Sequence, residues 1–173
     1  SFDIKDAKDE LSSYSSKDSV TVDVIYTEPD VTLADLNKDL YQNELSKATT
    51  NLSDASEADI KDLGNIVSKI NEYTLVPNEE FSFNKVVGTS VKNADQVAST
   101  LYVAVLKANI NLKSINRKAH DTVPSYTDKC FDAVAGKSGD FKFTNSKLEP
   151  IKIVATSEGG RVDVTIVGTK EKN

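Results

Sequence analysis

The chain has 173 residues, of which 38% are hydrophobic and 28% charged, and its formal net charge is −6. This length and composition predict one globular domain with room for a small extra lobe, and they argue against collagen-like, disordered and membrane-spanning proteins. The acidic total argues against nucleic-acid binding, which needs a basic surface to neutralise phosphates. Because the sequence contains no methionine, we expect it to be a piece of a longer protein.

The first 40 residues predict three short elements. Apolar residues at helical spacing predict an amphipathic helix over residues 3–14. Strict alternation of apolar and polar residues predicts a strand over residues 20–26. Thr32 begins a variant of the capping box, which predicts a second short helix over residues 32–40.

Two longer helices follow, with a strand between them. The first is predicted over residues 56–73, because Ser56 and the acidic residues after it suit a helix N-terminus. Alternation after Pro77 predicts a strand over residues 80–84. The second, over residues 94–109, is predicted to be buried, and its apolar stripe consists of Val97, Leu101, Val105 and Ala108.

Beyond Asn111 the pattern changes from helical to extended. Strands are predicted near residues 112–118, 121–126, 139–145 and 150–168. The last segment contains Gly159-Gly160 between two alternating apolar runs, which predicts a β-hairpin, and the tail 170–173 is predicted to fray. The sequence therefore predicts an α+β fold, in which three main helices precede a strand-rich, mostly antiparallel C-terminal half.

The residue types restrict the chemistry that the chain can perform. His120 is the only histidine and Cys130 the only cysteine, so we expect no metal site and no cofactor. Cys130 lies in a predicted loop among acidic residues, which predicts a structural or tolerated thiol rather than a nucleophile. His120 suits a general base that Asp132 or Asp121 orients, or else a half-buried polar side chain at a strand end.

Four ordered sequence blocks resemble the VanW domain family. They are residues 71–88, which contain Phe81-Ser82-Phe83-Asn84, then residues 96–102, residues 120–134 and residues 140–151. The similarity covers about residues 46–168, and residues 2–36 resemble the end of a peptidoglycan-binding segment that often precedes this domain. The resemblance therefore implies two parts, a peptidoglycan-binding-like segment at 1–40 and a VanW-like domain at 41–173.

The resemblance implies functional roles as well as a fold. Members of the family are cell-envelope proteins of Gram-positive bacteria, and some act as cysteine-dependent L,D-transpeptidases on peptidoglycan stem peptides. His120 and Asp132 resemble the base and the residue that orients it, whereas Asp95 stands where the family has its nucleophilic cysteine, and the glycines before that cysteine are absent. A carboxylate is a poor acyl acceptor from an amide, so we expect the acyl-enzyme chemistry to be lost.

Three functions remain open from the sequence. The first is a catalytically silent VanW-like domain that binds peptidoglycan, a cell-wall peptide or an envelope protein. The second is a residual transpeptidase-like or hydrolytic enzyme that uses His120 with Asp95, Asp132 or Cys130, and the third is a structural domain of a spore or surface assembly. The residues expected to contact a peptide are Arg117, Lys118, Tyr126 and Gln96.

The resemblance also implies where the protein works. We expect an extracytoplasmic location at the envelope or surface of a Gram-positive bacterium, and a parent protein that is anchored in the membrane. Both expectations rest on the family and not on the composition of this chain, since a single cysteine suits either compartment.

Overall fold

The computed structural model describes residues 40–169. The helix and strand predicted at 3–14 and 20–26, nearly all of the helix predicted at 32–40, and the tail 170–173 lie outside the described residues. The described part falls within one compact unit, Asn37–Asn173. No helix within residues 40–169 is long and apolar enough to cross a bilayer.

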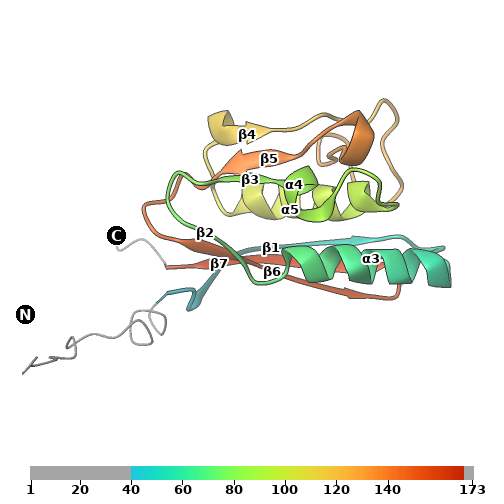
Figure 1. Ribbon diagram of the computed structural model, residues 1–173, viewed down its shortest axis with the longest axis horizontal. Helices are drawn as coiled ribbons and strands as arrows, with labels where there is room; N and C mark the ends of the chain where they lie inside the picture. The colour runs from blue at the N-terminus through green and yellow to red at the C-terminus, as the bar shows by residue number, and fades with distance from the viewer. Residues whose placement is uncertain (1–39, 170–173) are drawn as a thin grey trace, which may run out of the picture. The chain divides into compact units, whose positions relative to one another are not determined.

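A four-stranded antiparallel sheet forms one layer of this unit (Figure 1). Its strands, in spatial order, are β1 (Asn43–Asn51), β7 (Arg161–Gly168), β6 (Ile151–Glu158) and β2 (Tyr73–Leu75). The predicted hairpin is confirmed as β6 and β7, with Gly159-Gly160 at its turn. Alternate residues of β1, β6 and β7 are buried, so one face of the sheet carries the core.

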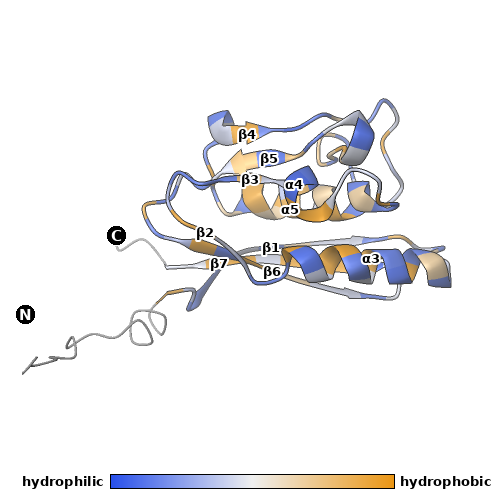
Figure 2. Cartoon of the chain, viewed as in Figure 1, coloured by the Kyte–Doolittle hydropathy of each residue, from blue (hydrophilic) through white to orange (hydrophobic). Residues whose placement is uncertain are grey.

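Two helices cover that face of the sheet. Helix α3 (Glu57–Ile70) packs on β6, and helix α5 (Ala94–Lys107) packs on β1 and β7. Apolar residues of α3 recur at helical spacing (Figure 2), and those that are buried are Leu63, Ile66, Val67 and Ile70. The burial predicted for α5 is confirmed, because nearly every residue from Ala94 to Val105 is buried.

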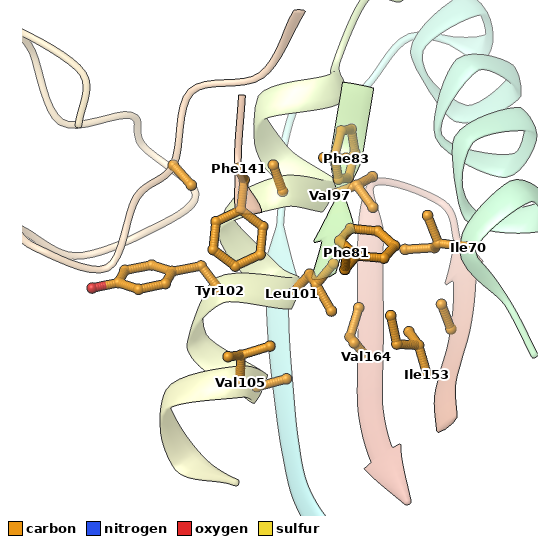
Figure 3. Close-up of a cluster of buried hydrophobic side chains, with 14 of the residues drawn as sticks. Ile70, Phe81, Phe83, Val97, Leu101, Tyr102, Val105, Phe141, Ile153 and Val164 are labelled. Atoms are coloured by element: carbon orange, nitrogen blue, oxygen red, sulfur yellow. The ribbon is translucent and has the colours of Figure 1, made fainter. Parts of the chain in front are cut away.

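A second, three-stranded sheet lies on the other side of α5 (Figure 1). Its strands in spatial order are β3 (Glu80–Ser82), β5 (Lys142–Thr144) and β4 (Ile115–Asn116), and the short helix α4 (Phe83–Val87) follows β3. Four phenylalanines of this sheet and the segments beside it are fully buried; they are Phe81, Phe83, Phe141 and Phe143. Figure 3 shows the first three of them beside Leu101 of α5. Because α5 lies between two sheets, it has no broad solvent face, which explains its burial.

The predicted α+β class and antiparallel pairing are confirmed, but several elements differ from the prediction. Strand β1 was not predicted, and the strand predicted at 121–126 is wrong, because residues 117–135 form an irregular segment. The strand predicted at 112–118 reduces to a 3-10 turn (Leu112–Ser114) and β4. The helix predicted to reach Tyr73 ends at Ile70, since Tyr73 already pairs with Ile153 in the sheet.

Candidate functional site

The first turn of α5 places Asp95 beside the irregular segment 117–135. The helix begins after Asn93, whose left-handed backbone (φ 62°) turns the chain into the helix. Asp59 at the start of α3 fixes this turn, because it accepts a hydrogen bond from Asn93 Nδ2 at 2.9 Å and pairs with Lys92 Nζ at 2.8 Å. Hydrogen bonds from Lys92, Ser56 and Asn93 hold the pKa of Asp59 well below its usual range. The start of α3 therefore determines where α5 begins.

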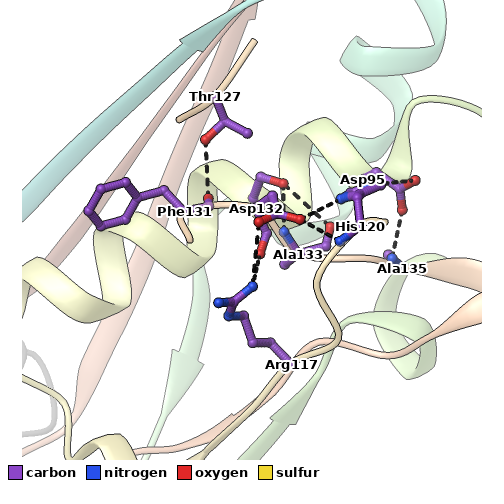
Figure 4. Close-up of polar contacts among 9 residues, drawn as sticks. Asp95, Arg117, His120, Thr127, Phe131, Asp132, Ala133 and Ala135 are labelled. Atoms are coloured by element: carbon purple, nitrogen blue, oxygen red, sulfur yellow. Dashed lines mark hydrogen bonds and ion pairs between the residues drawn. The ribbon is translucent and has the colours of Figure 1, made fainter. Parts of the chain in front are cut away.

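Asp95, His120 and Asp132 form a continuous row of side chains (Figure 4). His120 Nε2 lies 3.1 Å from Asp95 Oδ2, and His120 Nδ1 lies 2.9 Å from Asp132 Oδ2. The backbone N–H of His120 also donates to Asp132 Oδ2 at 2.5 Å. The exposed fraction falls along the row, from 40% for the Asp95 side chain to 18% for His120 and 3% for Asp132. Only the Asp95 end is open to a solute.

Asp132 is held as a carboxylate although it is buried. Burial alone raises its pKa, but hydrogen bonds from the His120 backbone and side chain, together with the charge of Arg117, lower it further than burial raises it. The net pKa of Asp132 lies below its ordinary value of 3.8. A charged Asp132 orients the His120 ring and favours a proton on Nδ1.

The two carboxylates around His120 restrict the number of protons in the row. If Nδ1 donates to Asp132 and the ring is neutral, Nε2 carries a lone pair that faces an oxygen of Asp95. The contact between Nε2 and Asp95 Oδ2 is a hydrogen bond only when the ring is doubly protonated or Asp95 carries the proton. A neutral histidine between two carboxylates therefore lacks one proton, the proton that would make the contact between His120 Nε2 and Asp95 Oδ2 a hydrogen bond.

The second oxygen of Asp95 is also occupied. Asp95 Oδ1 accepts a hydrogen bond from the backbone N–H of Ala135 at 2.6 Å. Asn84 fixes this loop, because its side chain accepts from Gly136 N–H at 2.8 Å and donates to the carbonyl oxygens of Gly136 and Gly139. Gly136 has a φ of +84°, and a Cβ there would lie 3.0 Å from the Thr89 carbonyl oxygen. Asn84 and Gly136 thus hold the Ala135 N–H in position.

Of the residues predicted to contact a peptide, Arg117 and Lys118 differ in their accessibility. Arg117 Nη1 donates to the Asp132 carbonyl oxygen at 2.8 Å and lies 3.5 Å from Asp132 Oδ1, and its guanidinium lies 4.9 Å from the centre of the Tyr102 ring. These contacts give Arg117 a supporting position beneath Asp132. Lys118 is exposed and donates to the Ser138 carbonyl oxygen at 3.2 Å.

Tyr126 and Gln96 differ in how far they are buried. Tyr126 is half-buried near the row, and burial, followed by the charge of Asp95, raises the pKa of its hydroxyl. Gln96 is 1% exposed and is turned towards the four-stranded sheet, where Nε2 donates to the Gly160 carbonyl oxygen at 2.8 Å and to Thr50 Oγ1 at 3.3 Å. A side chain this buried does not meet a solute, so Gln96 connects α5 to the hairpin turn.

A cleft of about 460 Å³ opens beside Asp95. Its walls are the segment that leads into α5 and the loop that Asn84 holds, and its lining residues are Thr89, Ser90, Val91, Lys92, Asn93, Ala94, Asp95, Ala135, Gly136 and Lys137. Cys130 is exposed in a turn and does not line this cleft. Within residues 40–169 there is no group of three or more His, Cys, Asp or Glu side chains that could hold a metal ion.

Three groups that shape this site were not predicted from the sequence. Asn84 stands at the end of the Phe81-Ser82-Phe83-Asn84 block, which was noted only as part of the resemblance. Ser99, one turn after Asp95 on α5, accepts a hydrogen bond from the Ala133 N–H at 2.9 Å and fixes the other end of the loop. The Ala135 N–H leaves no sequence signal, because every residue except proline has a backbone N–H.

Part of the chain is similar in sequence to known proteins. Residues 94–167 match the family model described as VanW like protein. The chain is 31% identical over 119 residues to the uncharacterized protein YoaR of Bacillus subtilis strain 168, a match that covers 56% of this chain but only 39% of the relative. No solved structure gives a significant match. The family match spans α5, His120, Asp132 and the C-terminal hairpin, so residues 94–167 are similar to VanW-like proteins over the part of the chain that carries the candidate site.

Proposed function

We propose that this chain is a cell-envelope domain that binds peptidoglycan peptides in the cleft beside Asp95 and has no thiol-based acyl-transfer activity. The family match supports an association with the envelope. An extracytoplasmic location and a peptidoglycan ligand go beyond that match and rest on the resemblance of the sequence motifs. Three observations on the site support the proposal, and each concerns Asp95 or the residues around it.

The main support is the position of Asp95. It stands in the first turn of a helix and within 3.1 Å of His120 Nε2, where a cysteine-dependent enzyme would hold its thiolate. One carboxylate oxygen takes the place next to the base, and the other accepts the Ala135 N–H, a donor suited to an oxyanion. A carboxylate is a poor nucleophile towards an amide, so the site favours binding over acyl transfer.

A second support is that, among residues 40–169, the His120 ring nitrogens contact only the two carboxylates and no hydroxyl or thiol. His120 is 18% exposed, and both of its ring nitrogens face carboxylates. Cys130, the only thiol in the sequence, lies outside the cleft that Asp95 lines. A substrate carbonyl in the cleft would therefore meet a carboxylate, hydroxyls, lysines and backbone groups.

A glycan-cleaving mechanism fits the geometry less well. Such a mechanism needs two carboxyl groups that flank the scissile bond with access to it. Asp132 is 3% exposed and lies behind the His120 ring, so Asp95 and Asp132 cannot both contact a sugar in the cleft. The site offers one accessible carboxylate instead of two.

The experiment that tests the proposal combines a binding assay with an activity assay. The pure chain is sedimented with cell-wall sacculi, and in parallel it is incubated with muropeptides that are then analysed by mass spectrometry. We expect co-sedimentation and unchanged muropeptides. Lys137→Gln is expected to weaken co-sedimentation, whereas Lys113→Gln, an exposed lysine outside the cleft lining, serves as the matched control.

Other results would point to the remaining functions. Muropeptide products that form with the wild type and vanish in His120→Ala would show a residual enzyme. Neither co-sedimentation nor turnover would contradict the proposal and favour a protein partner. Arg117→Ala is a poor test of binding, because it removes support from the buried Asp132 and would alter the site indirectly.

A further inference from the structure

We infer that the cleft beside Asp95 recognises a free α-amino acid group, with the ligand's ammonium on Asp95 and its carboxylate on Lys137. The inference deepens the proposed function, since it names the chemical group that a cell-wall peptide would present to this site. It rests on the charges of the cleft, on the hydrogen-bonding capacity that remains at Asp95, and on the proton count of the row Asp95, His120 and Asp132.

Asp95 retains unused acceptor capacity. A carboxylate offers about four lone-pair sites; the Ala135 N–H uses one of them, and His120 Nε2 uses a second only when the ring is doubly protonated. The Asp95 side chain is 40% exposed and lines the cleft. An ammonium in the cleft can therefore bind Asp95 without displacing either partner.

The number of protons available to Asp95, His120 and Asp132 favours a cationic ligand beside Asp95. With Asp132 ionised and a neutral His120 ring, Asp95 Oδ2 faces the lone pair of His120 Nε2. A ligand ammonium has three N–H donors and can supply a proton donor to the Asp95 oxygen that the neutral ring leaves without one. An apolar or purely anionic ligand supplies no such donor.

Lys137 supplies the opposite charge. Two lysines line the cleft, Lys92 and Lys137. Lys92 is already paired with Asp59 at 2.8 Å, whereas Lys137 is exposed and makes no side-chain hydrogen bond or ion pair with any residue between 40 and 169. Thr89 and Ser90, which are exposed at the same cleft, add hydroxyl groups that can bind a carboxylate. One cation and one anion in a single cleft match a zwitterion.

The test uses 2,6-diaminoheptanedioic acid, each end of which is a free α-amino acid group. Its di-N-acetyl derivative lacks the positive charges of the ammonium groups. Its diamide lacks the negative charges of the carboxylates. Binding to the full chain is followed by the amide signals of Asp95, Ala135 and Lys137 in two-dimensional NMR titrations. Asp95→Asn and Lys137→Gln remove one charge each at nearly constant size, and Lys113→Gln is the control.

We expect saturable binding of the unmodified compound and about tenfold or greater weakening for each derivative and each cleft variant, because each change removes a charged hydrogen bond. Lys113→Gln should bind as the wild type does. Equal binding of the acetylated compound would overturn the assignment of Asp95, and equal binding of the diamide would overturn that of Lys137.

The same proteins are then sedimented with native and with N-acetylated sacculi, which separates this inference from the proposed function. Co-sedimentation that acetylation does not change would support the proposed function and overturn the inference. Binding of the free compound without co-sedimentation would support the ligand class and contradict the proposed function. Absence of both signals would overturn the two together.

Discussion

At the scale of single residues, the side chain at position 95 determines the chemistry of the row. We predict that Asp95→Cys, made in a Cys130→Ser background, gives a thiol with an apparent pKa about one unit or more below the usual value of about 8.5. The first turn of α5 and a protonated His120 would both stabilise the thiolate. The pH dependence of alkylation by iodoacetamide measures this pKa.

The control for that experiment removes the base. The same variant with His120→Ala should return the thiol pKa towards about 8.5, because only the helix terminus remains to stabilise the thiolate. An apparent pKa that is equal in the two proteins would show that His120 does not interact electrostatically with position 95. That result would also weaken the argument that Asp95 replaces a nucleophile.

A second residue-scale prediction concerns Asp132 and acid stability. The folded-state pKa of Asp132 lies below its ordinary value, so its stabilising contribution is complete above about pH 5 and is lost as the pH falls through the folded pKa. We predict that the free energy of unfolding of Asp132→Asn depends less steeply on pH between about 5 and 2, by up to about 1.4 kcal/mol per pH unit. Urea unfolding at a series of pH values measures the slope, and equal slopes would contradict the prediction.

Part of the candidate site could be predicted from the sequence, and the rest depended on contacts that leave no pattern. The resemblance placed Asp95, His120 and Asp132 together, and they do lie in one row. Their roles in function remain a prediction. Burial of Gln96 between α5 and the sheet was not visible in the sequence, because its partner, the Gly160 carbonyl oxygen, is 64 residues away.

At the scale of elements, the turn of the β6–β7 hairpin offers a matched pair of substitutions. A Cβ at Gly160 would overlap the Leu52 carbonyl oxygen, whereas nothing lies within 4 Å of a Cβ at Gly159, whose φ is +58°. We predict that Gly160→Ala destabilises the fold by about 3 kcal/mol, through steric overlap, and Gly159→Ala by about 1 kcal/mol, through backbone conformation alone. Urea unfolding midpoints compare the two, and a larger loss for Gly159→Ala would contradict the packing.

The elements that the sequence predicted well have a strong periodic pattern. Helices α3 and α5 and the C-terminal hairpin carry apolar residues at regular spacing, and each is present. Strand β1 has no such pattern, because its inward positions are Ser46, Ala48 and Thr50. Ser46 and Thr50 contact α5 through hydrogen bonds instead, with Ser46 Oγ 2.6 Å from the Ala104 carbonyl oxygen and Thr50 Oγ1 2.7 Å from Thr100 Oγ1.

β1 is a strand that was not predicted, whereas residues 121–126 were predicted as a strand and form none. Pro124 interrupts the apolar pattern, and the surrounding backbone is fixed by side chains in place of a neighbouring strand. The His120 N–H donates to Asp132, and the Ala133 N–H donates to Ser99. Tertiary hydrogen bonds of this kind give an irregular segment a defined conformation, and a local pattern does not reveal them.

At the scale of the whole molecule, the described residues contain a complete two-sheet core. The buried cluster runs from Ala48 to Ile166. We therefore predict that a chain limited to residues 40–173 unfolds in one cooperative step, with a urea midpoint close to that of the full chain. Circular dichroism and tyrosine fluorescence should give coincident transitions, and a broad or much earlier transition would show that residues 1–39 contribute to the same core.

The position of β7 in the middle of the large sheet has a consequence for the order of folding. β7 pairs with β6 on one side and with β1 on the other, and Thr49 of β1 bonds to Asp163 of β7 across 114 residues. During synthesis β1 therefore gains its partner only after the residues of β7 have been made. Pairing at this sequence separation is slow, so β1 and α5 stay exposed to chaperones until the β6–β7 hairpin has left the ribosome.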